Sequence, residues 1–238
     1  MGRSHAPARW WRHDLMLAVQ SLWLADTGKP QDAAKWQASN AALRKHYRRT
    51  AFFGNPAALA WAEDIGLAYD ETHPLPEYHE DMARAWSIGK LHAASCMTRP
   101  FIHVDGDVIL HRPLAVKGVP FFVQGREPWI YAPDWWRRFG VAPLPLPSPI
   151  PWSYNFGVFG GEAWQDIARA CHTAHDFALS SRFAIATACP RIMPAVIIEQ
   201  IWVPALLARE GISPLELLRP NRWREDFASA GFEHWLPR

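Results

Sequence analysis

The chain has 238 residues, of which 49% are hydrophobic and 20% charged. This length suffices for one domain with a substantial core, and the composition excludes an intrinsically disordered protein. The net charge is only +2 and the basic residues are scattered, so nothing indicates a nucleic-acid-binding protein. The three cysteines are widely spaced, which excludes both a disulfide framework and a zinc site made of CxxC pairs.

The sequence contains no segment typical of a membrane span or a signal peptide. No stretch reaches the ~18 to 20 apolar residues that cross a membrane, and the apolar run over residues 15–24 leads to no small-residue cleavage site. We therefore expect a cytoplasmic protein. Residues 1–13 are basic and are predicted to form a tail. Residues 14–238 show neither a repeat nor a dividing linker, which predicts a single domain.

Strands and helices alternate through the first half of the chain. Residues 15–24 are apolar at both parities, a pattern typical of a strand buried on both faces of a parallel sheet. Further strands are expected at 50–54, near Tyr69 and at 101–110, and helices over 33–47, 57–66 and 78–95. This alternation predicts an α/β fold with a mainly parallel central sheet flanked by helices.

The second half of the chain has a less regular pattern. Strands are expected at 118–125 and 153–161, and helices over 162–179 and 195–210. Residues 129–140 are rich in aromatic side chains and have no clear type, and residues 221–238 show no clear period. Proline occupies every second position from Pro143 to Pro151, which predicts a stiff loop.

The main chemical signal is Asp105-Gly106-Asp107 inside the apolar run 101–110. Ionised carboxylates in such a strand are costly unless they are paired or hold a metal. Mg²⁺ or Mn²⁺ is bound by one or two carboxylates together with substrate phosphate oxygens, and a glycine permits close approach of the backbone to a ligand. Ligands of α/β sheets also bind at the carboxyl ends of strands. The alternative is a pair of surface aspartates at a turn.

Two further groups could contact a ligand. Lys90 precedes the Asp105 strand and could pair with a diphosphate, or it could be an ordinary surface lysine. Asn155, Gly157, Gly160 and Gly161 favour a binding role, because an amide both donates and accepts hydrogen bonds and glycines let a ligand approach closely. The alternative for these four residues is a plain turn at the end of a strand.

Glu199 and Gln200 interrupt the apolar helix predicted over 195–210. Burial tends to raise the pKa of a carboxyl group, as a general base requires. Glu199 could take the proton of an acceptor in an inverting reaction or stabilise positive charge in a retaining one. The sequence leaves both roles open. His103, inside the strand, is expected to be a packed core histidine.

The segment RPFIHVDGDVILHRPL resembles the D-x-D segment of GT-A-fold glycosyltransferases, in which an apolar strand delivers two aspartates to a metal and to the diphosphate of a nucleotide sugar. Other segments of the chain are similar to segments of these enzymes and occur in the same order. AWSIGKLHAAS is similar to the preceding helix, YNFGVFGG to the donor-pocket segment, IIEQIWVPALLA to a later helix with an acidic-Gln start, and FEHW to the place of a metal-binding C-terminal His. The array also resembles an uncharacterised bacterial family of glycosyltransferase-like proteins.

This resemblance extends from Leu15 to His234 and implies a GT-A-like (Rossmann-like) single domain over residues 14–238. Residues 14–125 would form the nucleotide-sugar-binding half and residues 152–238 the acceptor side. By the same resemblance Mn²⁺ or Mg²⁺ is held by Asp105, Asp107 and His234, Asp105 also contacts the diphosphate, and Lys90, Asn155, Gly157, Gly160, Gly161 and Gln200 bind substrate. Relatives often continue with Gly and Lys after this His, whereas this chain reads Trp235-Leu236-Pro237-Arg238.

The prediction is therefore a metal-dependent glycosyltransferase with Glu199 as its catalytic residue. It would take a nucleotide-sugar donor and an acceptor that is a glycan, lipid, protein or small molecule. One alternative is a haloacid-dehalogenase-like phosphatase, in which the first Asp is a nucleophile. The other is a non-catalytic nucleotide- or carbohydrate-binding protein with the same fold. Donor base, sugar, acceptor and stereochemistry do not follow from the sequence.

Overall fold

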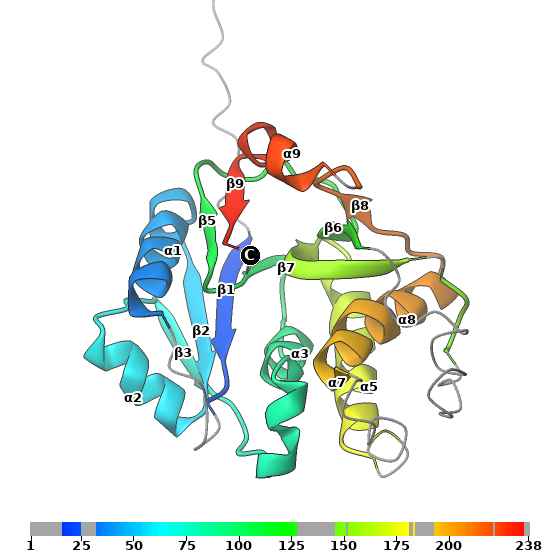
Figure 1. The fold of residues 1–238 in the computed structure, drawn as a ribbon, viewed down its shortest axis with the longest axis horizontal. Helices are drawn as coiled ribbons and strands as arrows, with labels where there is room; N and C mark the ends of the chain where they lie inside the picture. Colours follow the sequence, from blue (N-terminus) through cyan, green and yellow to red (C-terminus); the bar gives the residue numbers. More distant parts are fainter. Residues whose placement is uncertain are drawn as a thin grey trace, which may run out of the picture.

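The described part of the chain is built around a seven-stranded β-sheet (Figure 1). The structure is a computed structural model that describes residues 16–24, 32–127, 146–150, 152–180, 183, 193–220 and 222–235. The predicted tail 1–13, the aromatic segment 129–140 and residues 143–145 and 151 of the proline-rich loop lie outside these residues. In the described ranges, no helix is both long and apolar enough to span a bilayer.

The sheet is mixed, with one reversed strand. Its order is β3-β2-β1-β4-β7-β6-β8. Every neighbouring pair is parallel except the two pairs formed by β7, with β4 and with β6. The strands are β1 (Leu17–Leu22), β2 (Thr50–Gly54), β3 (Glu71–Pro74), β4 (Phe101–Val104), β6 (Phe122–Glu127), β7 (Ser153–Gly161) and β8 (Leu215–Glu216). A mainly parallel α/β sheet flanked by helices is thus confirmed.

The helices cover both faces of this sheet (Figure 1). They are α1 (Ala33–His46), α2 (Pro56–Asp64), the 3₁₀ helix η2 (Glu80–Ala85), α3 (Ile88–Ser95), α5 (Trp164–Ala178), α7 (Pro194–Val196), the π-helical segment η3 (Ile197–Trp202), α8 (Val203–Arg209) and α9 (Trp223–Ala230). Side chains of β1 alternate between the faces: Leu17 and Val19 pack in the cluster with α3, α5 and α8, whereas Ala18 packs with Leu43 and Tyr47 at the end of α1.

The predicted strand 101–110 is divided in two, which corrects the sequence-based expectation. β4 ends at Val104, residues 105–107 turn, and β5 (Val108–Leu110) pairs with β9 (Phe232–His234) in a separate two-stranded sheet. Gly106 lies against an indole ring: a Cβ atom at this position would be 2.0 Å from Cε2 of Trp36. The two aspartates therefore follow a strand at the sheet's carboxyl edge instead of lying inside one.

Other boundaries also differ from the prediction. The helix expected over 78–95 is a 3₁₀ turn followed by α3, and the strand expected near Tyr69 begins at Glu71. The segment without a clear period contains α9 and β9. Gly231 ends α9 with a φ of 86°, a left-handed conformation that favours glycine and directs the chain into β9.

Gly160 and Gly161 have a packing role at the end of β7. Gly160 pairs with Ile102, and Gly161 with Phe101. Their φ angles are 151° and 150°, and added Cβ atoms would lie 2.1 Å from the carbonyl oxygens of Phe101 and Pro120, respectively. Glycine is thus required here by the close approach of neighbouring backbone.

We expect Gly160→Ala to lower the free energy of unfolding by about 2 to 5 kcal/mol, because it adds both a backbone clash and strain at positive φ. Gly66→Ala is the matched control: its φ is 72°, but no atom lies within 4 Å of the added Cβ, so we expect about 1 kcal/mol. Urea-induced unfolding measures both. Equal losses in the two variants would contradict the proposed clash.

Candidate active site

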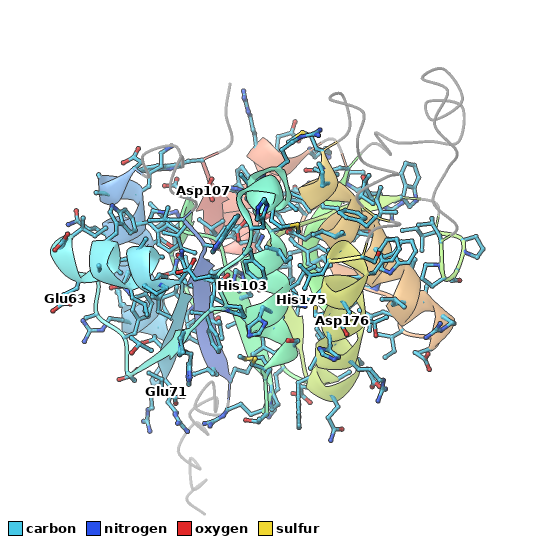
Figure 2. All side chains as sticks on the ribbon, turned by 90° about the horizontal axis from the view of Figure 1, so that it is seen from below. Glu63, Glu71, His103, Asp107, His175 and Asp176 are labelled. Carbon is cyan, nitrogen blue, oxygen red and sulfur yellow. The ribbon has the colours of Figure 1, made fainter. Side chains whose placement is uncertain are left out.

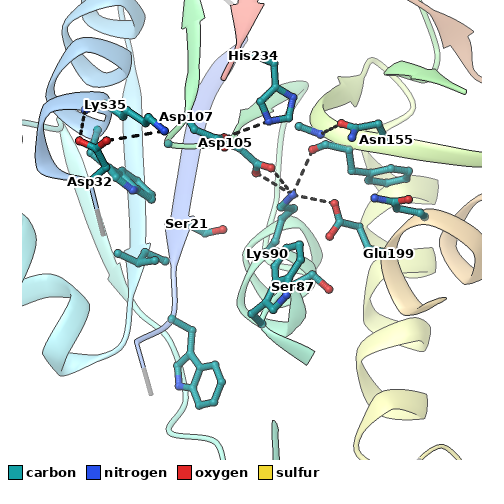
Figure 3. A pocket seen from close by; sticks show the side chains of 18 residues that line it. Ser21, Asp32, Lys35, Ser87, Lys90, Asp105, Asp107, Asn155, Glu199 and His234 are labelled. Atoms are coloured by element: carbon teal, nitrogen blue, oxygen red, sulfur yellow. Dashed lines mark hydrogen bonds and ion pairs between the residues drawn. The ribbon is translucent and has the colours of Figure 1, made fainter. Parts of the chain in front are cut away.

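A cavity of about 520 Å³ opens at the carboxyl ends of β1 and β4 (Figure 3). Its walls come from β1, the start of α1, the turn before α3, the Asp105–Asp107 turn, β7, η3 and β9. The volume is in the range of ligand pockets, and the carboxyl edge of an α/β sheet is where such pockets form. Polar side chains from segments far apart in the sequence meet in this cavity.

Lys90 lies at the centre of these polar groups. Its Nζ is 2.7 Å from Asp105 Oδ1 and 2.8 Å from Glu199 Oε1, and it donates a further hydrogen bond to the carbonyl of Phe156 at 3.3 Å. Lys90 is only 6% exposed and Glu199 2%. Lys90 is therefore neither a surface lysine nor free to reach a diphosphate without leaving its two carboxylates (Figure 3).

The environment changes the acidity of these groups. Burial alone would lower the pKa of Lys90, but the charges of Asp105 and Glu199 raise it above its ordinary value. Burial raises the pKa of Glu199 to about 7, and the charge of Asp105 adds to this effect while Lys90 opposes it. Lys90 therefore stays charged, and Glu199 titrates close to neutral pH.

Asp107 and His234 form a second pair on the same cavity. His234 Nε2 is 3.2 Å from Asp107 Oδ1, and His234 Nδ1 is 2.9 Å from Gln124 Oε1. The backbone supports this pair, because the N–H of Trp235 donates to the Asp107 carbonyl at 3.0 Å. Burial would raise the pKa of Asp107, but the contact with His234 lowers it below its ordinary value.

The arrangement of Asp107 and His234 fits a divalent metal in part. The described residues hold no group of three or more His, Cys, Asp or Glu side chains arranged as metal ligands. However, a metal-ligating His usually donates its other ring N–H to an oxygen acceptor, and His234 Nδ1 lies within hydrogen-bond distance of Gln124 Oε1. Mg²⁺ and Mn²⁺ commonly take few protein ligands and complete their coordination with substrate phosphates and water. These residues could hold such an ion jointly with a diphosphate.

Asn155 and Gly157 line the cavity, but their contacts are to neighbouring protein groups. Asn155 Nδ2 donates to Glu127 Oε1, and its Oδ1 accepts from the N–H of Gly157, both at 2.8 Å. A Cβ on Gly157 would lie 2.7 Å from His234 Cε1. Gly157 thus makes room for the His234 imidazole.

The structure brings together most of the predicted site residues. Those that line the cavity are Lys90, Asp105, Asp107, Asn155, Gly157, Glu199, Gln200 and His234. Gly160 and Gly161 are not among its lining residues. Because β7 runs antiparallel to β4, only its first half reaches the carboxyl edge of the sheet. The expected ligand contacts of these two glycines are therefore replaced by backbone packing.

His103 is fully buried, and Figure 2 shows it in the middle of the fold. Its Nε2 is 2.8 Å from Ser21 Oγ, and its ring stacks on Phe159 with centroids 5.2 Å apart. Burial, with a smaller effect of Lys90, lowers its pKa well below the ordinary value. Its environment is that of the packed core histidine expected from the sequence.

Sequence reasoning missed several residues that line the cavity or support its lining residues. Trp86 lines the cavity and is 48% exposed, and Ser21 and Gln124 support the histidines. Gln20 and Gln124 are polar residues within buried strands. A polar residue in an apolar strand indicates a specific hydrogen-bond partner, and this pattern could have identified Gln124 as a support of the site. No local pattern distinguished Trp86 from the other tryptophans.

Fold and cavity together define an α/β protein with a cavity lined by polar side chains at the carboxyl edge of its sheet. A family described as a family of unknown function (DUF6734) matches residues 16–127. No curated protein sequence matches the chain. Among solved structures, the apo form of mouse xyloside xylosyltransferase 1 is similar over 93% of this chain and 97% of its own, with a TM-score of 0.46 and 12% identity. A similarity this distant does not establish a shared activity.

We expect Lys90→Met to lower the free energy of unfolding by about 3 to 5 kcal/mol, because it leaves two carboxylates without their counter-charge. The control is Lys35→Met. Lys35 also lines the cavity, but its side chain is 32% exposed and its Nζ lies 3.8 Å from Asp32 Oδ2. This substitution should lower the free energy of unfolding by less than about 1 kcal/mol. Urea-induced unfolding measures both.

The double variant Lys90→Met/Glu199→Gln should recover part of the loss, because it removes one of the two buried charges. If Lys90→Met is no more costly than Lys35→Met, the lysine does not stabilise the two carboxylates.

Proposed function

We propose that the protein is a metal-dependent glycosyltransferase that moves a sugar from a nucleoside-diphosphate donor to an acceptor. The observation that carries this proposal is the convergence of four groups in one cavity: the two carboxylates of the Asp105–Asp107 turn, the His234 imidazole and the buried Glu199 carboxylate. Their order along the chain is that of the D-x-D enzymes which the sequence resembles. A GT-A-like donor site over 14–125 and an acceptor side over 152–238 are part of the proposal.

On the donor side, Asp107 and His234 would hold Mn²⁺ or Mg²⁺ together with diphosphate oxygens. Asp105 lies in the same turn as Asp107. An ion bound there would neutralise the charge that develops on the leaving diphosphate. Lys90 holds Asp105 at its present position and supplies a positive charge on the inner side of the turn. Gly106 allows the backbone of the turn to pack directly against the Trp36 ring.

In the transfer, the acceptor oxygen bonds to the anomeric carbon, and the bond from that carbon to the diphosphate breaks with its electron pair. The acceptor hydroxyl loses its proton to Glu199 if configuration is inverted, or to the departing diphosphate if it is retained. In the second case Glu199 stabilises positive charge at the anomeric carbon. Both roles require the ionised carboxylate, of which Oε1 is held by Lys90.

The donor site is tested by titration calorimetry of nucleoside diphosphates with and without Mn²⁺. We expect Mn²⁺-dependent binding of one nucleotide, weakened about tenfold or more in Asp107→Asn because a metal ligand is lost. Asp32→Asn is the control, since Asp32 also lines the cavity and caps α1, and Asn caps helices equally well.

Absence of nucleotide binding in the folded protein, with and without Mn²⁺, would overturn the proposal. Hydrolysis of 4-nitrophenyl phosphate under those conditions would favour the phosphatase. Nucleotide binding without sugar transfer would favour the non-catalytic binding protein.

With the donor identified, we expect Glu199→Gln to lower kcat by about 10²- to 10⁴-fold and to leave nucleotide affinity unchanged. In the wild type, kcat should fall as pH drops below about 7, because protonation removes the required carboxylate; the pKa of Glu199 is raised to about 7. Steady-state rates between pH 5 and 9 measure this limb. A residual rate in Glu199→Gln with the same acid limb would show that another group titrates.

A further inference from the structure

The cavity has two sides, separated by Lys90 (Figure 3). Asp107 and His234 lie on the side of β9 and α1. On the other side, Ser87 is tied to the helical segment that carries Glu199, because its hydroxyl donates to the carbonyl of Ala195 at 3.1 Å. In Figure 3, Ser87 lies away from His234 and close to Glu199. If the donor diphosphate occupies the first side, the second side is left for the acceptor.

The second side contains buried hydrogen-bond acceptors that lack donors. Glu199 Oε2 and Gln200 Oε1 are both buried, and neither has a hydrogen-bond partner among the described residues. Glu199 is 2% exposed and Gln200 9%, and both line the cavity. They are consecutive residues of the π-helical segment η3, a distortion that is frequent at functional sites. Unsatisfied buried acceptors cost free energy that a ligand with matching donors would recover.

An aromatic side chain lines the same cavity as these acceptors. Trp86 lines the cavity, directly precedes Ser87 and is 48% exposed. An exposed indole face offers a large, rigid apolar surface. The ligand that suits this side therefore needs a flat apolar face and at least two hydroxyl donors on its edge.

The charge of the site restricts the ligand further. Two carboxylates flank one lysine at the centre of the cavity, so a phosphate group on an acceptor would meet like charge near Glu199. A single Ser or Thr hydroxyl would satisfy only one of the two acceptors. A pyranose or furanose ring meets both requirements, since its C–H face is apolar and its hydroxyls donate hydrogen bonds.

We propose that the acceptor is a saccharide whose ring lies on Trp86 and whose hydroxyls donate to Glu199 Oε2 and Gln200 Oε1. This inference rests on the proposed function and deepens it. One of these hydroxyls provides the oxygen that bonds to the anomeric carbon of the donor sugar as the diphosphate leaves with the electron pair. Trp86 and Gln200 are thereby assigned to acceptor recognition.

The test combines a panel of nucleotide sugars and Mn²⁺ with three kinds of acceptor: 4-nitrophenyl glycosides of common hexoses and pentoses, a peptide containing Ser and Thr, and dodecyl phosphate. Products are detected by mass spectrometry. We expect transfer to glycosides only. Trp86→Ala should lower kcat/KM for the glycoside about tenfold or more through loss of the stacking surface, with nucleotide affinity unchanged.

Trp152→Ala is the matched control, because Trp152 is 39% exposed but is not a lining residue of the cavity and instead lies 5.0 Å from the Arg126 guanidinium. Gln200→Leu should also raise KM for the glycoside. Transfer to the peptide or to dodecyl phosphate, or equal rates in Trp86→Ala and Trp152→Ala, would overturn the saccharide assignment. Nucleotide binding without transfer to any glycoside would overturn it too, while leaving the donor site intact. If the wild-type protein binds no nucleotide, the proposed function itself is refuted.

Discussion

One buried ammonium group connects the parts of the chain that make the cavity. Lys90 comes from α3, and its partners come from the end of β4, from η3 and from the backbone of β7. Burying the charged groups of Lys90 and Glu199 costs several kcal/mol for each ion, and apolar side chains of similar volume would stabilise such positions at least as well. The arrangement is therefore better explained by the chemistry of the cavity than by the stability of the fold.

The reversed direction of β7 determines which part of it contributes to the site. Its first half reaches the carboxyl edge of the sheet, where the Gly157 carbonyl accepts from the N–H of Asp105 at 2.8 Å. Its second half lies alongside Phe101 and Pro120, where only glycine fits. A single strand thus supports the aspartate turn at one end and permits close strand packing at the other.

The α/β class and most of the cavity could be predicted from the sequence because their signals are local. Asp105 and Asp107 stand out against an apolar run, and Glu199 and Gln200 stand out in an apolar helix. The break after Val104 could not be predicted, because it is accompanied by the packing of Gly106 on Trp36, which is 70 residues earlier in the chain.

The burial of Lys90 between two carboxylates could not be predicted from the sequence either. A lysine in a helix is usually exposed, and only the fold places a carboxylate on each side of it. The same holds for Gly160 and Gly161, which were expected to let a ligand approach closely but are instead approached by neighbouring backbone. Long-range contacts decide these roles, and a single sequence does not contain them in readable form.

The pairing of β9 with β5 brings a late segment of the chain to a cavity that is otherwise formed around the central sheet. All strands of the seven-stranded sheet precede residue 217, whereas His234 follows α9 and completes the cavity from the small second sheet. The central sheet and the His234 side of the cavity thus come from separate parts of the chain. Under the proposed function, binding of a metal together with a diphosphate requires β9 alongside β5, because β9 carries His234.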